Sequence, residues 1–328
     1  MYRIRIGCRL EYLASGPTPA VFIVQPPLHP RQILGRESFL AEGAGARLTE
    51  EFQDAFGNRC QRAVLPAGGC TIRYDALALV PEDADAANAA ARQIPADELP
   101  ARLLRYTLPS RYAEVDELLG FAWETFARVP PGWERARAIC DWVHHNVTYR
   151  RGVSQPDWSA TDVLGRRQGV CRDRAHLVIA LCRAFSMPAR YSVAYLPDIG
   201  VADDGAPMDF HAYAEVWLDG GWYVFDPHDV APRKGRVFIA SGLDAADAAF
   251  ATLYGGASLM RFQVWADPVA ENGEKLDLRL PATPAAATPV AASPVPPAPT
   301  VPVAESPPLL NRPAADAPPS WTPSVGVA

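Results

Sequence analysis

About the first 80 residues alternate between apolar and polar side chains with the period of two that a half-buried β-strand requires. On the opening stretch the apolar face would carry Tyr2, Ile4, Ile6, Cys8, Leu10 and Tyr12, and the other face Arg3, Arg5, Arg9 and Glu11. Turn signals follow at Gly57-Asn58 and Gly68-Gly69, and alternation resumes after the second turn. Short strands punctuated by turns predict a small antiparallel β-sandwich over residues 1–81.

From about residue 82 the spacing of apolar residues becomes helical. One apolar stripe follows the positions i, i+3, i+4, i+7 and i+11 and consists of Val115, Leu118, Leu119, Ala122 and Phe126. Pro130-Pro131 should end that helix. A second stripe consists of Ala136, Ile139, Cys140 and Val143. Ser159 is a suitable N-cap for a short third helix, with Asp162 in its first turn. Together with later strand-like stretches, these helices assign residues 82–280 to a second domain.

The last part of the chain has a different composition. Fourteen of the residues 281–328 are proline, mixed with alanine, valine, threonine and serine. Such a segment cannot bury enough apolar surface to offset the entropy of ordering it, and it favours extended polyproline conformations. We therefore expect residues 281–328 to form a disordered tail.

Composition and charge exclude several classes of function. The net charge of −6 and the scattered Lys and Arg residues give no basic surface for nucleic acid or for a membrane. The N-terminal stretch alternates charged and apolar residues, which is not the pattern of a secretory signal, and no run approaches the roughly 20 apolar residues that span a bilayer. Six cysteines without paired spacing are typical of reduced thiols. We expect a cytoplasmic protein.

One cysteine stands at a position where a small buried residue gains little. Cys171 follows Gly169 at the predicted start of a helix, on the same stripe as Ala175, Val178 and Cys182. Free backbone N–H groups and the helix dipole favour an anion there, and the thiolate is the nucleophilic form of cysteine. Cys171 is thus a candidate nucleophile, the alternative being a packing cysteine, as expected for Cys140 and Cys182.

A nucleophilic cysteine needs a base and a group that orients the base. Two strands, 211–218 and 221–226, flank Asp219-Gly220, which is a strong signal for a two-residue hairpin turn. Such a turn pairs Leu218 with Gly221. His211 and Asp226 then lie diagonally on the same face of the sheet, close enough for their side chains to meet. A three-residue loop would place them on opposite faces.

These residues carry a resemblance to a known family. The stretch "GVCRDRAHLVIALCRAFSMPARY", followed by "DFHAYAEVWLDGGWYVFDP", resembles the bacterial transglutaminase-like superfamily. The resemblance extends upstream through "LPSRYAEVDELL", and "DAFGNR" is similar to the β-rich N-terminal domain often attached to these cores. In all it covers about residues 1–265.

The resemblance implies an α+β fold with a papain-like core, in which the nucleophile begins a helix packed on an antiparallel sheet. It implies Cys171 as nucleophile, His211 as general base and Asp226 as the residue that orients the base. The family's chemistry is acyl transfer from an amide through a thioester, without a cofactor. Arg174 departs from the pattern, because many relatives have an aromatic residue there, and we expect it to alter the substrate cleft.

Other candidates remain open. The oxyanion donors would be the Cys171 backbone N–H and Trp158, which resembles the indole donor of eukaryotic transglutaminases; Gln168 is a third possibility, and Trp158 would otherwise be a core or rim residue. His176 lies about 140° around the helix from Cys171, so we expect a structural hydrogen bond. His144 and His145 fit a solvated or capping pair.

We expect a cysteine hydrolase, a protease or amidase rather than a crosslinking enzyme, acting on a peptide or isopeptide amide, because nothing in the sequence marks a site for an amine acceptor. One alternative is a non-catalytic scaffold that binds protein partners through the Pro-rich tail. Another is a metal-dependent hydrolase, in which His228 joins Cys171, His211 and Asp226 around zinc. The spacing of these residues lacks the usual zinc motifs, so we expect no metal.

Overall fold

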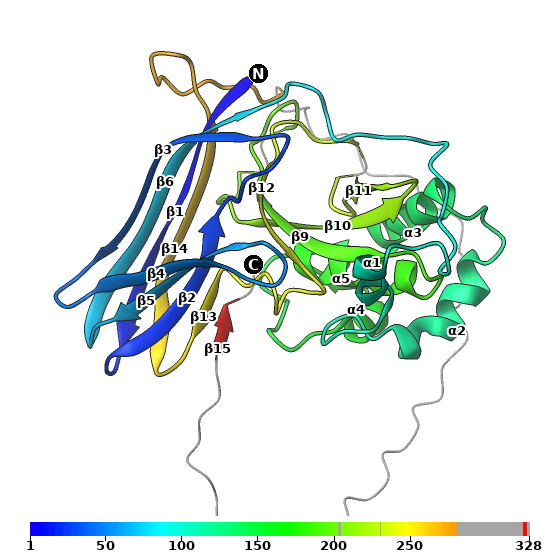
Figure 1. Cartoon of the computed structure of the whole chain (residues 1–328), viewed down its shortest axis with the longest axis horizontal. Helices are drawn as coiled ribbons and strands as arrows, with labels where there is room; N and C mark the ends of the chain where they lie inside the picture. Colours follow the sequence, from blue (N-terminus) through cyan, green and yellow to red (C-terminus); the bar gives the residue numbers. More distant parts are fainter. Residues whose placement is uncertain (203–204, 230, 281–323, 327–328) are drawn as a thin grey trace, which may run out of the picture.

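Two antiparallel sheets form a β-sandwich, as the alternating N-terminal pattern predicts (Figure 1). The computed structural model describes residues 1–202, 205–229, 231–280 and 324–326. One sheet has the order β14-β1-β6-β3 and the other the order β15-β13-β2-β5-β4. The strands contributed by the N-terminal region are β1 (Tyr2–Ala14), β2 (Thr18–Gln25), β3 (Ile33–Glu42), β4 (Arg47–Gln53), β5 (Arg59–Leu65) and β6 (Gly68–Val80). The predicted apolar face of β1 is buried from Ile4 to Tyr12.

The sandwich is not confined to residues 1–81. It also takes in β13 (Ala251–Leu253) and β14 (Ala257–Pro268), which return from beyond the second domain to pair with β2 and β1. The reason is that β1 lies in the interior of its sheet and pairs along its length with both β6 and β14. An unpaired edge on so long a strand would expose a row of backbone groups. The sandwich therefore contains strands from both sides of the expected boundary at residue 81.

A four-stranded antiparallel sheet with the order β11-β10-β9-β12 forms the centre of the second domain. Its strands are β9 (Ala189–Tyr195), β10 (His211–Leu218), β11 (Gly221–Phe225) and β12 (Val237–Gly242). Helix α5 (Cys171–Arg183) packs against β10 and β9, and α2 (Val115–Phe126), α3 (Trp133–Asn146) and α4 (Ala160–Arg166) pack against α5. Figure 1 shows the helices on one side of this sheet and the sandwich on the other.

The helical stripes predict the first helices well. The buried residues of α3 are the four of its predicted stripe, and those of α2 match theirs except for Leu119, which is 39% exposed. Ser159 caps α4, and its backbone N–H donates to Asp162 Oδ2 at 3.2 Å. The remaining short elements are α1 (Ala101–Leu104), the 3-10 helix η1 (Arg105–Thr107), β7 (Thr148–Tyr149) and β8 (Gln168–Gly169).

Helix α5 is buried on every side, although its sequence suggested one inward stripe. It lies between the central sheet and three other helices, so its arginines are also buried and must be paired. Arg172 bonds Asp173 at 3.0 Å, Arg174 donates to the backbone carbonyl of His144 at 2.6 Å, and Arg183 donates to the carbonyl of Leu243 at 2.6 Å. Apolar spacing alone predicts this helix but not its burial on every side, because the buried arginines interrupt the apolar pattern.

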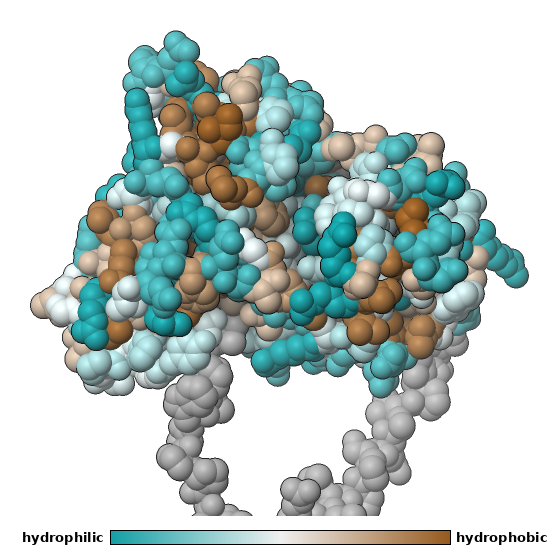
Figure 2. All heavy atoms as spheres, in the orientation of Figure 1, coloured by the Kyte–Doolittle hydropathy of each residue, from teal (hydrophilic) through white to brown (hydrophobic). Residues whose placement is uncertain are grey.

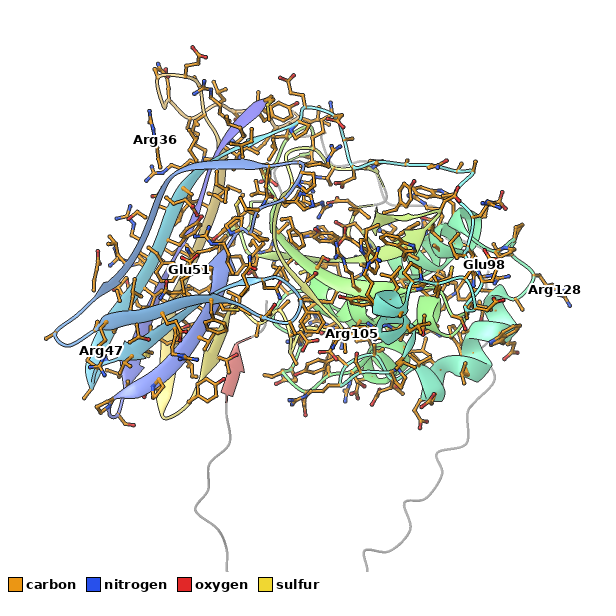
Figure 3. All side chains as sticks on the ribbon, in the orientation of Figure 1. Arg36, Arg47, Glu51, Glu98, Arg105 and Arg128 are labelled. Atoms are coloured by element: carbon orange, nitrogen blue, oxygen red, sulfur yellow. The ribbon has the colours of Figure 1, made fainter. Side chains whose placement is uncertain are left out.

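Most of the predicted disordered tail, residues 281–323, lies outside the described residues. Near its end, Ser324–Gly326 form the short strand β15, which pairs with β13. None of the helices in the described ranges is long and apolar enough to cross a membrane. Arg36 and Arg47 lie on the outer part of the sandwich (Figure 3). On the face of the molecule in Figure 2, hydrophilic residues lie between patches of hydrophobic residues.

Candidate active site

The start of α5 is held by a buried carboxylate. Asp173, which is fully buried, accepts the backbone N–H of Val170 at 2.9 Å and the hydroxyl of Ser154 at 2.9 Å. A side chain on Gly169 would meet the Asp173 Cβ at 2.7 Å, so glycine is needed for this close approach. Cys171 is the first residue of the helix, and its backbone N–H is one of the four that have no acceptor within the helix.

The hairpin has the predicted register. Leu218 pairs with Gly221, and the pairing continues to Ala214 opposite Phe225. Both turn residues have positive φ, 48° at Asp219 and 89° at Gly220, as the predicted two-residue turn requires. The parity of the two strands therefore places His211 and Asp226 on one face of the sheet.

The two predicted partners are joined directly. His211 Nε2 lies 2.6 Å from Asp226 Oδ2, and the other carboxylate oxygen, Oδ1, accepts the backbone N–H of His228 at 3.0 Å. Burial alone would raise the pKa of Asp226, but His211 and Arg236 outweigh it and hold that pKa well below its usual range. Asp226 is thus a buried, ionised carboxylate that fixes the imidazole. The ring nitrogen left to face a reactant is Nδ1.

Cys171 and His211 line the same pocket, which encloses about 380 Å³. Hydrogen bonds from the backbone N–H groups of Ala212 and Arg172 reach the Cys171 sulfur. Since Ala212 follows His211 on β10, these contacts bring the thiol against the strand that carries the base. Met208, Asp209 and Arg233 are among the residues that form the rest of the wall. The structure therefore brings Cys171, His211 and Asp226 into one cluster.

Burial opposes the effect of the helix end on the Cys171 thiol. Burial raises the pKa of Cys171 to about 12, with Asp209 and Asp226 also raising it, and the N–H groups of Ala212 and Arg172 only partly offset this. Cys171 is 7% exposed, so the loss of hydration outweighs the helix dipole.

The comparisons with known proteins agree with this geometry. The profile of the transglutaminase-like superfamily matches residues 121–227, a range that holds all three clustered residues. The crystal structure of a candidate cysteine protease from Cytophaga hutchinsonii is 31% identical and has a TM-score of 0.75. The similarity covers 84% of this chain and 94% of that one. The chain belongs to the transglutaminase-like superfamily.

The chain is also similar in sequence to two curated proteins from mycobacteria, both described as uncharacterized. One, from Mycobacterium leprae (strain TN), is 28% identical over 144 residues, which are 43% of this chain and 51% of the relative. Another, from Mycobacterium tuberculosis (strain ATCC 25618 / H37Rv), is 31% identical over 153 residues, 43% of this chain and 48% of the relative. The chain therefore spans about half the length of the curated relatives it matches.

Two residues considered for the oxyanion do not reach the pocket. Trp158 is 8% exposed and lies under the guanidinium of Arg166, 4.6 Å from its ring centre, rather than among the pocket residues. Gln168 pairs with Thr148 in the short parallel ladder of β7 and β8, and it does not line the pocket either. Of the donors considered, the Cys171 backbone N–H is the one whose position fits.

Arg174, which we expected to alter the substrate cleft, does not line the pocket. Its side chain is buried and its guanidinium binds the carbonyl of His144 near the end of α3, so the expected effect on the cleft is wrong. His176 does make the expected structural bond. Its Nε2 accepts the N–H of Ala245 at 3.1 Å, and its ring stacks with those of Tyr112 and Tyr191. Burial lowers the pKa of His176 to about 3.

The other histidines lie as follows. His144 Nδ1 is 3.0 Å from the carbonyl of Pro227, and His145 Nδ1 is 2.7 Å from that of Asp141. The His228 ring lies 5.6 Å from that of His211, and both line the pocket. Even so, no group of three His, Cys, Asp or Glu residues within the described ranges could hold a metal ion.

Two functional neighbours escaped the sequence analysis. Asp173 stands three residues after Val170, the spacing at which an acidic residue accepts the N–H at a helix start, and that spacing could have revealed it. Arg236 binds Asp226 at 3.0 Å from the segment just before β12. Nothing in the local sequence around Arg236 marks it, because the contact depends on how β12 is placed beside β9.

Proposed function

We propose that the protein is a cysteine hydrolase that cleaves a peptide or isopeptide amide through a thioester on Cys171. The observation that carries the proposal is the shared pocket of Cys171 and His211, with Asp226 bonded to the far side of the imidazole at 2.6 Å. The candidate cysteine protease from Cytophaga hutchinsonii, to which the chain is similar over most of its length, supports the same class of activity.

The first half of the reaction would form the thioester. His211 Nδ1 takes the proton of the Cys171 thiol while the sulfur attacks the amide carbonyl, which gives a tetrahedral oxyanion. The Cys171 backbone N–H at the start of α5 would donate to that oxyanion. When the carbon–nitrogen bond breaks, the imidazolium returns the proton to the leaving amine. Because the pKa of the buried thiol is raised, removing the proton during attack is essential.

The second half would release the acyl group. A water molecule gives a proton to His211 and attacks the thioester carbonyl, and the collapse of this intermediate expels the Cys171 sulfur, which regains the proton. Asp226 keeps the imidazole in one orientation throughout and stabilises its charged form. The products are a carboxylic acid and an amine, so the reaction balances without a cofactor.

Alkylation by iodoacetamide tests the reactive pair without a known substrate. Peptide mass spectrometry should find Cys171 labelled faster than Cys140 and Cys182, which serve as buried controls in the same molecule. His211→Ala should slow labelling of Cys171 by about 10²-fold, the lower range for general base catalysis. Equal labelling of Cys171 in both proteins would remove His211 as the base. Preferential labelling of Cys140 or Cys182 would favour a non-catalytic scaffold.

Hydrolysis and amine transfer can be separated with isotopically labelled water. Wild-type protein and Cys171→Ala are each incubated with a mixed peptide pool in ¹⁸O-water and with a fluorescent primary amine. The proposal expects ¹⁸O in new carboxylates with the wild type only. Incorporation of the fluorescent amine in place of ¹⁸O would instead identify a crosslinking type of activity.

A further inference from the structure

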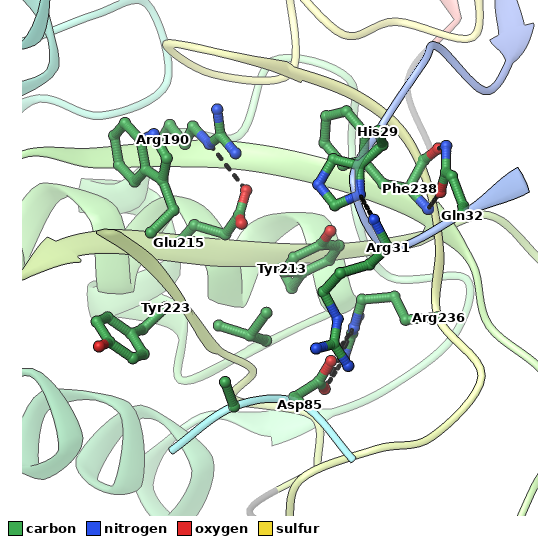
Figure 4. A pocket seen from close by; sticks show the side chains of 13 residues that line it. His29, Arg31, Gln32, Asp85, Arg190, Tyr213, Glu215, Tyr223, Arg236 and Phe238 are labelled. Carbon is green, nitrogen blue, oxygen red and sulfur yellow. Dashed lines mark hydrogen bonds and ion pairs between the residues drawn. The ribbon is translucent and has the colours of Figure 1, made fainter. Parts of the chain in front are cut away.

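Arg236 connects the His211–Asp226 pair to the segment that leads out of the sandwich. Its side chain is 7% exposed, and its Nη2 donates to Asp226 Oδ2 at 3.0 Å and to Asp85 Oδ2 at 2.9 Å. Asp85 lies between β6 and α1. Figure 4 shows the guanidinium against Asp85 in the wall of a second cavity, of about 200 Å³, on the sandwich side of the central sheet. The result is a buried chain of hydrogen-bonded side chains: His211, Asp226, Arg236 and Asp85.

Arg236 and His211 bind the same carboxylate oxygen. Asp226 Oδ2 accepts from both, while Oδ1 is occupied by the backbone N–H of His228. Arg236 is itself fixed, since its guanidinium lies 4.1 Å from the ring centre of Tyr213. The Tyr213 ring is nearly parallel to the His211 ring, with 13° between their planes. These contacts hold the guanidinium beside the oxygen of Asp226 that the imidazole also binds.

We propose that Arg236 is a positioning residue of the active site, and that Asp85 sets how much of its positive charge acts on Asp226. This inference rests on the proposed function. With Arg236 in place, the guanidinium engages part of the negative charge of Asp226, so less of that charge acts on His211 than with a lone carboxylate. Asp85 in turn engages part of the Arg236 charge.

Opposite changes follow from removing each partner. Without the buried positive charge of Arg236, the Cys171 thiol loses its proton less readily, so the acid limb of the pH profile moves to higher pH. Without the charge of Asp85, Arg236 acts more strongly on Asp226, and the limb moves to lower pH. Other titratable or charged groups lie near Asp226, His211 and Cys171, and both variants leave them in place: His228, Asp229, Asp209, Arg137, Arg174 of α5 and Cys140 of α3.

The experiment measures the rate of Cys171 alkylation by iodoacetamide from about pH 5 to about pH 10, a range that spans histidine and cysteine titration. Arg236→Gln should raise the midpoint of the acid limb by about one pH unit, and Asp85→Asn should lower it by about half a unit. Arg236→Lys, which keeps the charge, should stay close to wild type. Circular dichroism and thermal unfolding establish that each variant is folded.

The outcomes separate this inference from the proposed function. A folded Arg236→Gln whose profile coincides with wild type overturns the inference, as do shifts of the same sign in both variants, which would reflect general loosening. If Arg236→Gln does not fold, Asp85→Asn decides alone: a shift to lower pH supports the inference and an unchanged profile overturns it. If His211→Ala is labelled at Cys171 as fast as wild type, the proposed function itself fails.

Discussion

Helix α5 buries charged side chains at both ends, and the two ends are built for different purposes. At the N-terminal end, Asp173 accepts hydrogen bonds that hold the helix start, and the first residue, Cys171, lines the pocket. At the C-terminal end, Arg183 donates to the carbonyl groups of Ala189, Leu108 and Leu243. One end presents the Cys171 thiol to a cavity, and the other connects three segments that are far apart in the sequence.

The difference lies in where the polar groups are directed. Arg183 donates its hydrogen bonds to protein carbonyl groups and to the hydroxyl of Ser110, and its side chain is buried, with 2% of the residue exposed. Asp173 also binds protein groups, the Val170 N–H and the Ser154 hydroxyl. Cys171, two residues earlier, begins the helix and lines the pocket. A helix can thus be anchored at its C-terminal end and reactive at its N-terminal end. The two ends should respond differently to substitution, in activity at one and in stability at the other.

The largest effect expected is on activity, from Cys171→Ala. Removing the sulfur abolishes thioester formation, so amide hydrolysis should fall by about 10³-fold or more, the scale of losing a nucleophile. The free energy of unfolding should change by only about 1 kcal/mol, because a small buried group is replaced by a smaller one. Hydrolysis of the peptide pool and urea unfolding measure the two quantities. Retained hydrolysis would contradict a role for Cys171 in the chemistry.

At the opposite end, Arg183→Met should act on stability. The substitution leaves buried carbonyl groups without donors, and the free energy of unfolding should fall by about 3–5 kcal/mol. Below its unfolding transition, the variant should still label Cys171 at close to the wild-type rate. Arg183→Lys keeps the charge but not the planar fork of donors, and it should recover part of the loss. A strong fall in labelling with unchanged stability would reverse the comparison.

The sequence predicts the residues gathered at the N-terminal end of α5 better than the contacts that surround them. The Asp219-Gly220 turn determines parity over a few residues, and this was enough to predict that His211 and Asp226 share a face. The contact between Arg236 and Asp85 joins positions 151 apart, and no local pattern encodes it. The pairing of β14 with β1 escaped prediction for the same reason. Burial all around α5 was missed because its arginines interrupt the apolar pattern, although each has partners inside the fold.

A subtler change at the N-terminal end is Gly169→Ala. The added methyl group would meet the Asp173 Cβ at 2.7 Å and must displace the carboxylate that accepts the Val170 N–H. The free energy of unfolding should fall by about 1–3 kcal/mol, the usual cost of overpacking, and Cys171 labelling should slow. Gly165→Ala in α4 is the matched control, since nothing lies within 4 Å of its added methyl group. It should stabilise the protein by about 0.5–1 kcal/mol.

The smallest effect expected comes from the middle of α5 and depends on pH. Burial lowers the pKa of His176 to about 3, whereas an unfolded histidine has a pKa of about 6.5. The neutral ring therefore favours the folded state above about pH 6.5, and this contribution is lost as the pH falls from there towards about 3. The loss should approach about 1.4 kcal/mol per pH unit.

His176→Gln keeps an acceptor for the Ala245 N–H but does not titrate. Urea unfolding of both proteins near pH 7, 6 and 5 should show the wild type losing stability more steeply, because other titrating groups contribute equally to both. A constant difference between the two proteins across this range would mean that His176 titrates in the folded protein as it does in the unfolded chain, and it would contradict the lowered pKa.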